Sequence, residues 1–313
     1  MNRRRSAGVA LITALLVVAI STSLAVGLAV RQNQAIQSTG GLLLTDQARE
    51  LARSGLELAL FALDEDDAKV DGPADAWAEG LSVLPLDVGT LSIQVTDLQG
   101  RLNLNNLIDP EGLIDPVARA RLDRLLRALN LDPALADRIA DWIDPDDQPS
   151  PGGAEDAFYA GRNPPHRAAN RPLVSVSSLR LLEGLGDEEF AQLAPQVAAL
   201  PRGTSLNLNT ASDEVLRALG DGVKPSSPEV DAEERMPENH ESVDAALQAR
   251  GIDPASVTPQ RLSVRSAYFL VDVRVELVQS RARLLAVVHR PGDAPATVIA
   301  RTFESCLNDI SCI

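Results

Sequence analysis

The sequence has few of the residues that build most enzyme active sites. It contains two cysteines and three histidines in 313 residues. The histidines, His166, His240 and His289, are far apart, and the HExxH, GxSxG and GxxxxGK[ST] motifs do not occur. These absences argue against a zinc protease, a serine hydrolase and a P-loop nucleotide-binding protein. A hydrolase that uses two carboxylates stays open in so acidic a chain, although no pair stands out.

A surplus of positive charge is also missing, since the formal net charge is -15 at pH 7. Such a surface repels nucleic acid and anionic lipid. Two segments, 181–190 and 207–219, each resemble half of a helix-hairpin-helix motif, whose turn presents backbone N–H groups to a phosphate. In the first segment, Asp187, Glu188 and Glu189 would face that phosphate. We therefore interpret both segments as packed helices and expect no nucleic-acid partner.

One long hydrophobic run stands out near the N-terminus. Residues 9–30 carry no charge, and as a helix they would measure about 33 Å, enough to span a bilayer. Arg3, Arg4 and Arg5 precede the run, which predicts a cytoplasmic N-terminus and a single pass. A cleaved secretory signal and a twin-arginine signal are two alternatives. A short basic leader that ends in Gly8 instead resembles a type IV prepilin signal, with cleavage after Gly8 and the helix kept.

The same helix is predicted to continue far beyond the membrane. No proline occurs between residues 32 and 63, and apolar residues recur there every three or four positions. The predicted stripe is Leu44, Ala48, Leu51, Gly55, Leu58 and Ala62. Gly40 and Gly41 are expected to interrupt or bend the helix. The prediction is one helix from Val9 to about Leu63.

The rest of the chain predicts a sheet with helices inserted into it. Residues alternate apolar and polar from 91 to 96 and again from 269 to 277, and further strands are expected at 284–289 and 297–303. Gly100 is expected to turn the first strand into a hairpin with Leu102 and Leu104. Asp115 before Pro116 and Asp132 before Pro133 predict helix starts, and two more helices are expected near 179–182 and 187–197.

These patterns predict an α+β protein: a type IV pilin-like long N-terminal helix packed on an antiparallel sheet, with an inserted all-α domain. The expected units are a leader (1–8), a transmembrane helix (9–30), two parts of a pilin-like domain (31–107 and 204–313), an inserted helical domain (108–203), and an acidic mobile loop within the second part (about 222–259).

An acidic segment in the predicted helical insertion could bind a metal ion. Oxygen-bearing side chains, at positions spaced as in an EF-hand loop, are Asp144, Asp146, Gln148 and Glu155, and Asp156 follows. Pro149 stands where that loop needs glycine, so an EF-hand backbone is excluded. The carboxylates still predict a site for a hard cation, and Ca²⁺ is favoured over Mg²⁺. The simpler alternative is a solvated acidic loop.

The two cysteines, Cys306 and Cys312, lie six positions apart near the C-terminus. In an oxidising periplasm we expect them to form a disulfide that pins the tail. Zinc binding is the weaker alternative because two thiols complete only half of a tetrahedral site.

Taken in order, several motifs resemble the type II secretion system minor pseudopilin K family. They are the leader and long helix, DLQGRLNLNNL (97–107), ADWIDPDDQPSPGGAED (140–156), NRPLVSVSSLRLLEGLG (170–186) and SLNLNTAS (205–212). The resemblance covers nearly the whole chain. It implies cleavage by prepilin peptidase after Gly8, methylation of the new amino terminus at Val9, calcium in the acidic loop, and a place at the pseudopilus tip with minor pseudopilins I and J and the other pseudopilins. It also implies a location in the bacterial inner membrane, with most of the chain in the periplasm.

The fifth residue of the processed helix would be Thr13, where pilins usually carry glutamate. A carboxylate in an apolar core is unfavourable unless it is paired, and in a filament its partner would be the amino terminus of the subunit above. A tip subunit has no subunit above it, so Thr13 fits that place. We therefore expect a non-enzymatic assembly protein. The alternatives are a signal-anchored periplasmic hydrolase and a DNA-binding competence-type minor pilin.

Overall fold

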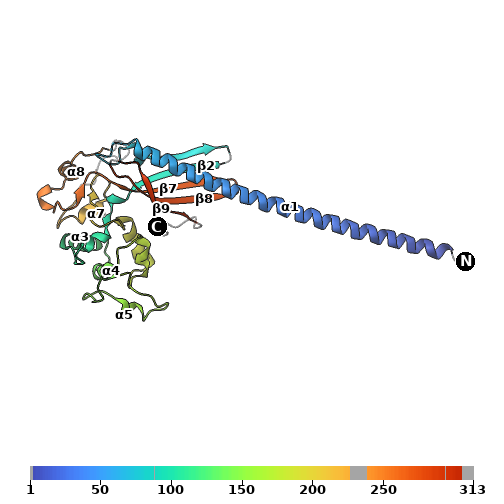
Figure 1. Cartoon of the computed structure of the whole chain (residues 1–313), viewed down its shortest axis with the longest axis horizontal. Helices are drawn as coiled ribbons and strands as arrows, with labels where there is room; N and C mark the ends of the chain where they lie inside the picture. Colours follow the sequence, from blue (N-terminus) through green and yellow to red (C-terminus); the bar gives the residue numbers. More distant parts are fainter. Residues whose placement is uncertain (1–2, 88, 226–237, 293, 305–313) are drawn as a thin grey trace.

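The computed structural model describes residues 3–87, 89–225, 238–292 and 294–304. A single long helix, α1 (Arg3–Asp64), projects from a compact head and carries the N-terminus at its far end (Figure 1). Its 62 residues correspond to about 90 Å at the usual helical rise. Gly8 and Val9 both lie within α1. The helix also includes Gly40 and Gly41, so the expected interruption at these glycines is wrong.

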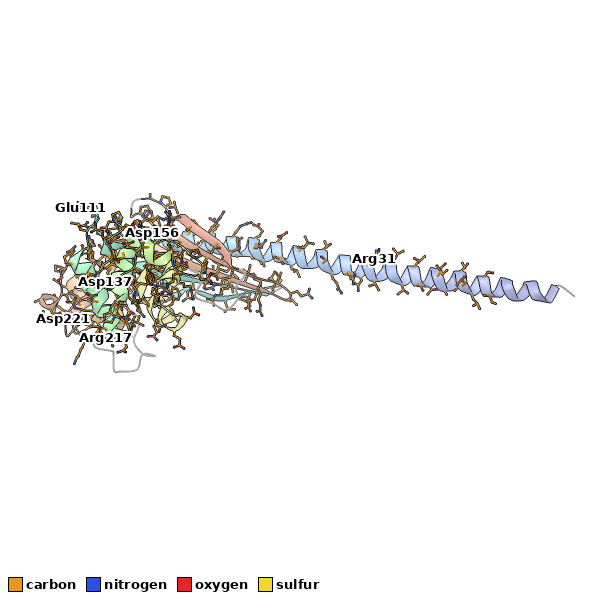
Figure 2. The ribbon with its side chains drawn as sticks, turned by 90° about the horizontal axis from the view of Figure 1, so that it is seen from below. Arg31, Glu111, Asp137, Asp156, Arg217 and Asp221 are labelled. Carbon is orange, nitrogen blue, oxygen red and sulfur yellow. The ribbon has the colours of Figure 1, made fainter. Side chains whose placement is uncertain are left out.

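The first half of α1 exposes a continuous apolar surface. Ile12, Leu16 and Leu28, for example, are 67%, 58% and 67% exposed, and Thr13 lies on the same exposed stretch. This part is long and apolar enough to cross a membrane, which removes such a surface from water. Figure 2 shows Arg31 on the bare helix, well away from the head.

The second half of α1 packs on the sheet through small side chains. Ala48, Ala52, Leu56, Ala59 and Leu63 are buried against it. A Cβ at Gly55 would lie 2.6 Å from Val273 Cγ1, so glycine allows this close approach. The predicted stripe is partly wrong, because Leu58 is 39% exposed. The buried face of α1 is rotated about the helix axis relative to that stripe, since other apolar residues with the same spacing pack against the sheet.

The sheet has five strands in the order β1-β2-β7-β8-β9, and every neighbouring pair is antiparallel. The strands are β1 (Leu81–Leu86), β2 (Gly89–Asp97), β7 (Tyr268–Leu277), β8 (Arg281–His289) and β9 (Thr297–Glu304). Alternate residues of β7, such as Phe269 and Val273, are buried under α1, and Trp77 of α2 (Ala76–Glu79) packs edge-on against Phe269. The helix-on-sheet prediction is confirmed.

The expected hairpin at Gly100 is wrong. β2 pairs with β1 and β7 instead, and the chain leaves the sheet through η1 (Leu98–Gly100). Each LNLN copy forms a two-residue strand that pairs in parallel with a distant segment. β3 (Leu102–Asn103) pairs with β4 (Val197–Ala198), and β5 (Leu206–Asn207) pairs with β6 (Leu262–Ser263).

The inserted helices form a separate buried core on the side of the head away from α1 (Figure 1). Their bounds are η2 (Leu104–Leu107), α3 (Pro116–Ala128), α4 (Leu135–Ile143), α5 (Asp156–Tyr159), η3 (Val176–Leu181), α6 (Asp187–Leu193) and η4 (Ala194–Gln196). Asp115 caps α3 as predicted, accepting hydrogen bonds from Val117 N and Ala118 N. The helix expected near 179–182 is the 3₁₀ helix η3.

The segment 222–259, expected to be a loop, contains regular structure where it is described. It includes α8 (Val243–Ala249) and η5 (Pro254–Ser256), and α7 (Asp213–Arg217) precedes it. Ala246 and Leu247 are buried in a third core with Leu216 and Val264. The loop prediction is therefore wrong for this half of the segment. The predicted pair Cys306 and Cys312 lies outside the described residues.

Candidate metal centre

Two of the acidic side chains of this centre come from the end of one helix. The apolar face of α4, including Leu135, Ile139 and Trp142, is buried in the insertion core. Asp141 lies one turn before Asp144, which is the C-cap residue of α4. Both carboxylates therefore project from the same side of the helix. A loop then returns the chain to Glu155, which immediately precedes α5.

The carboxylates of Asp141, Asp144 and Glu155 converge on one point. One oxygen from each lies within 4.8 Å of the others. The three residues are only 0%, 8% and 3% exposed. Such burial is rare for carboxylates unless they are paired or bind a metal ion.

Most of the carboxylate oxygens in this cluster have no partner among the described residues. Asp141 Oδ2 accepts a hydrogen bond of 2.9 Å from Ser150 N. Buried oxygens without a hydrogen bond are Asp141 Oδ1, Asp144 Oδ1, Glu155 Oε1 and Glu155 Oε2. No described cation forms an ion pair with any of the three acids. Four buried acceptors without partners are the arrangement that a bound cation would satisfy.

The loop lies directly against these acids because it contains two glycines. A Cβ at Gly153 would lie within 1.9 Å of Asp141 Oδ2, and one at Gly152 would lie 2.8 Å from Asp137 Oδ2. Gly152 N donates to the same Asp137 oxygen at 3.1 Å. Glycine is therefore required for the loop to close over the cluster.

Burial and mutual repulsion make these acids hard to ionise in the metal-free protein. Desolvation, followed by the charges of Asp144 and Asp141, raises the pKa of Glu155 to about 8. Desolvation and the charges of Asp146 and Asp141 raise the pKa of Asp144 to about 6. The pKa of Asp141 is also raised, mainly by burial. A divalent cation would reverse these shifts by favouring the charged forms.

The donor set suits a hard cation. Three carboxylates offer up to six oxygens, and Ca²⁺ takes six to eight oxygen ligands in flexible geometry. Zn²⁺ sites normally include histidine or cysteine, and none takes part in this cluster. Ca²⁺ therefore fits these residues better than Zn²⁺.

The structure brings together two of the five residues predicted to bind the metal and places the other three outside the cluster. Asp144 and Glu155 meet, but Asp146 and Gln148 are exposed, and Asp146 Oδ1 accepts from Gln148 N. Asp156 Oδ1 instead accepts from Ala168 N at 2.9 Å. Asp141 is a member of the cluster that the sequence prediction did not include, although its spacing of three from Asp144 on a predicted helix could have indicated it.

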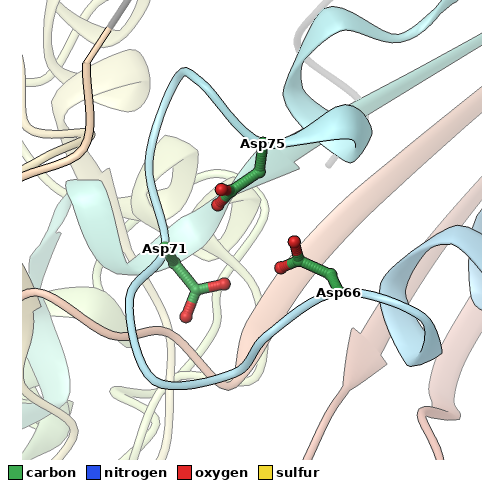
Figure 3. A group of neighbouring side chains, drawn as sticks. All are labelled: Asp66, Asp71 and Asp75. Carbon is green, nitrogen blue, oxygen red and sulfur yellow. The ribbon is translucent and has the colours of Figure 1, made fainter.

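A second group of three acids, Asp66, Asp71 and Asp75, lies between α1 and α2 (Figure 3). Arg290 fills the role of its cation, because its guanidinium contacts Asp71 and lies 2.9 Å from Asp66 Oδ2. Asp71 Oδ2 also accepts from Ser266 N at 2.7 Å, and Asp75 Oδ2 accepts from Gly72 N at 2.8 Å. This group is satisfied by the protein itself and is not a candidate metal site.

The helix-hairpin-helix resemblance has a structural explanation. Gly184 has a φ of +73°, and Arg138 Nη1 donates to the neighbouring Glu183 O at 3.0 Å. Asp187 pairs with Arg180, and Phe190 is buried. The turn is thus used to pack η3 and α6.

Comparisons with known proteins agree on one family. The family described as type II secretion system (T2SS), protein K, matches residues 100–202. The type II secretion system protein K of Pseudomonas aeruginosa is 36% identical over 316 residues, covering 96% of this chain and 93% of that protein. The protein K of Aeromonas hydrophila is 31% identical and covers 95% of this chain and 97% of its own length. A chain in the crystal structure of the GspK-GspI-GspJ complex from enterotoxigenic Escherichia coli has a TM-score of 0.71 and 26% identity, covering 83% of this chain and 97% of that chain.

Proposed function

Since this chain belongs to the type II secretion system protein K family, we propose that it acts as a minor pseudopilin at the tip of the pseudopilus. The observation that carries the proposal is 36% identity over 96% of the chain to a protein K. The related solved chain comes from a complex with GspI and GspJ. The counterparts of those two proteins are therefore the partners proposed for this chain, alongside the other pseudopilins.

The proposed topology places the N-terminus in the cytoplasm, the first half of α1 in the inner membrane and the head in the periplasm. The exposed apolar half of α1 and Arg3, Arg4 and Arg5 before it support this orientation. Prepilin peptidase would cut after Gly8, and the new amino terminus at Val9 would be methylated.

The tip position is supported by two features. Thr13 lies on the exposed apolar half of α1, where a pilin would carry an acid that pairs with the subunit above. The insertion widens the head on the side away from α1 (Figure 1), and such bulk is accommodated best at the end of a fibre. The role is assembly of the pseudopilus, with no catalytic step assigned to the chain.

We also propose that Asp141, Asp144 and Glu155 bind Ca²⁺. Their burial and four unpartnered oxygens support this assignment. The ion would tie the end of α4 to the start of α5, so its role would be to hold the insertion in shape.

The function is tested by expressing the full chain with its I and J counterparts and the peptidase. We expect the three proteins to purify together from detergent, and mass spectrometry to find methylated Val9 as the first residue. Gly8→Val should block processing, whereas Gly27→Val should not, because a Cβ at Gly27 meets nothing within 4 Å. An intact Met1, a cut near Ala29, or normal secretion by cells that lack the protein would contradict the proposal.

A further inference from the structure

A small cavity lined by arginines lies where the insertion joins the pilin-like part. The cavity has a volume of ≈ 20 Å³, and about 10–15 Å³ by the same measure is enough for one water. Arg101, Arg121 and Arg261 line it, together with polar residues such as Asn103 and Thr204. No aspartate or glutamate is among the lining residues. This is unusual in a chain with a net charge of -15.

The three arginines come from three different segments. Arg101 connects η1 to β3, at the entrance to the insertion. Arg121 belongs to α3, the first helix of the insertion. Arg261 directly precedes β6, and its carbonyl accepts a hydrogen bond from Leu206 N at 2.9 Å. A particle held by all three would therefore connect the insertion to the segments on both sides of it.

Arg121 is the most deeply buried of these residues and is not fully paired. It is 5% exposed. Its Nη2 donates to Thr258 O at 2.8 Å, but its buried Nε has no partner among the described residues. A buried N–H of a guanidinium without an acceptor is strongly unfavourable. Arg121 is one of the residues that line the cavity, and an acceptor there would lie beside its guanidinium.

Two carboxylates act on the three guanidiniums, since the charge of Asp97 acts on Arg101 and that of Asp115 acts on Arg121. Three positive charges therefore face two negative ones. Asp115 Oδ2 lies 2.8 Å from Arg261 Nη1 and also accepts from Gln260, while Asp115 Oδ1 caps α3. Arg101 forms no ion pair within 4.0 Å in the part of the chain that the structure describes. Burial lowers the pKa of Arg101, and burial together with the charges of Arg261 and Arg124 lowers the pKa of Arg121 to about 10.

We propose that this cavity binds one small inorganic anion of the size of chloride, held by Arg101, Arg121 and Arg261. The anion accepts the free Arg121 Nε–H and reduces the repulsion between the guanidiniums. The cavity is too small for sulfate or for the carboxylate end of a peptide. The bound anion stabilises the junction between the insertion and the pilin-like domain.

The test is thermal unfolding of the full chain in detergent, with chloride exchanged for gluconate at constant ionic strength. At about 100 mM anion, chloride should raise the melting temperature by about 2–4 °C relative to gluconate, because a ligand stabilises the state that binds it. Bromide should replace chloride, and sulfate should not. Crystals grown in bromide should show an anomalous peak within hydrogen-bonding distance of Arg121 Nε.

Variants connect this effect to the cavity. Arg101→Gln should remove the difference between chloride and gluconate. Arg127→Gln, at an exposed arginine of the same helix α3 as Arg121, should keep it. Equal melting temperatures of the unaltered chain in chloride and gluconate would overturn the proposal, whether or not Arg101→Gln folds. A full chloride effect in folded Arg101→Gln would overturn it as well.

Discussion

Two groups of three acids in this protein have similar geometry but different surroundings. In the first group, the guanidinium of Arg290 pairs with Asp66 and Asp71, while Asp141, Asp144 and Glu155 form no ion pair with a described cation. The acids of the first group all have partners within the chain: Asp75 accepts from Gly72 N and Asn239 Nδ2, and Arg290 links Asp66 and Asp71 to the carbonyl of Leu63 at the end of α1. The second leaves four buried oxygens without partners. The comparison indicates that the neighbouring cation, and not the number of acids, separates a structural ion cluster from the metal site proposed for Asp141, Asp144 and Glu155.

The largest expected effect comes from removing the internal cation. Arg290→Met leaves Asp71, which is 0% exposed, without its partner, and breaking such a buried pair usually destabilises by about 3–5 kcal/mol. We expect urea unfolding of the full chain to show this loss. Arg281→Met changes an exposed arginine at the start of β8 and should change stability by less than about 0.5 kcal/mol. Equal losses of stability in the two variants would contradict the conclusion that Arg290 is the internal cation of the first group.

Removal of calcium should have the next largest effect. A ligand present at about 100 to 1,000 times its Kd stabilises by about 3–4 kcal/mol. Chelation should therefore lower the melting temperature of the full chain by several degrees. The same loss should occur in Asp75→Asn, because that residue belongs to the other group. An unchanged melting temperature after chelation would contradict a calcium site.

Single ligands can then be tested by calorimetric titration with Ca²⁺. Glu155→Gln should weaken binding by about 100-fold, since it removes one of three charges from a buried site. Asp146→Asn should change the affinity by less than about threefold because Asp146 is exposed. A larger loss of Ca²⁺ affinity in Asp146→Asn than in Glu155→Gln would contradict this ligand set and favour the ligands predicted from the EF-hand spacing.

The smallest expected effect concerns pH. The raised pKa of Glu155, about 8, means that the metal-free protein holds a proton there at pH 7, and Ca²⁺ must displace it. Calcium affinity should therefore fall by about tenfold for each pH unit below 8. The metal-free protein behaves in the opposite way: a carboxyl with a raised pKa makes the fold less stable as pH rises from about 4.5 to 8. Titration at pH 7 should show release of about one proton, and Glu155→Gln should show less.

The sequence predicted the parts of the fold that depend on local patterns. The long helix and strands β7 to β9 follow from apolar spacing, and the start of α3 follows from Asp115 and Pro116. Pairings of two residues each, such as β3 with β4, carry almost no local signal. α8 was missed because its surroundings are rich in acids and prolines.

The candidate site could be predicted only in part for the same reason. Asp144 and Glu155 stand out in the acidic loop, whereas Asp141 lies in a predicted helix, outside the loop whose spacing indicates the ligands. The pairing of the acids in the other group depends on Arg290, which is 219 positions from Asp71. No spacing rule connects residues so far apart.

The most direct test is an anomalous difference map from crystals of the complex of this chain with its I and J counterparts, grown in millimolar Ca²⁺ and recorded at a wavelength where calcium scatters anomalously. The account predicts a peak about 2.3–2.6 Å from oxygens of Asp141, Asp144 and Glu155, and none beside Arg290. A peak among Asp66, Asp71 and Asp75, or no peak at either group, would contradict it.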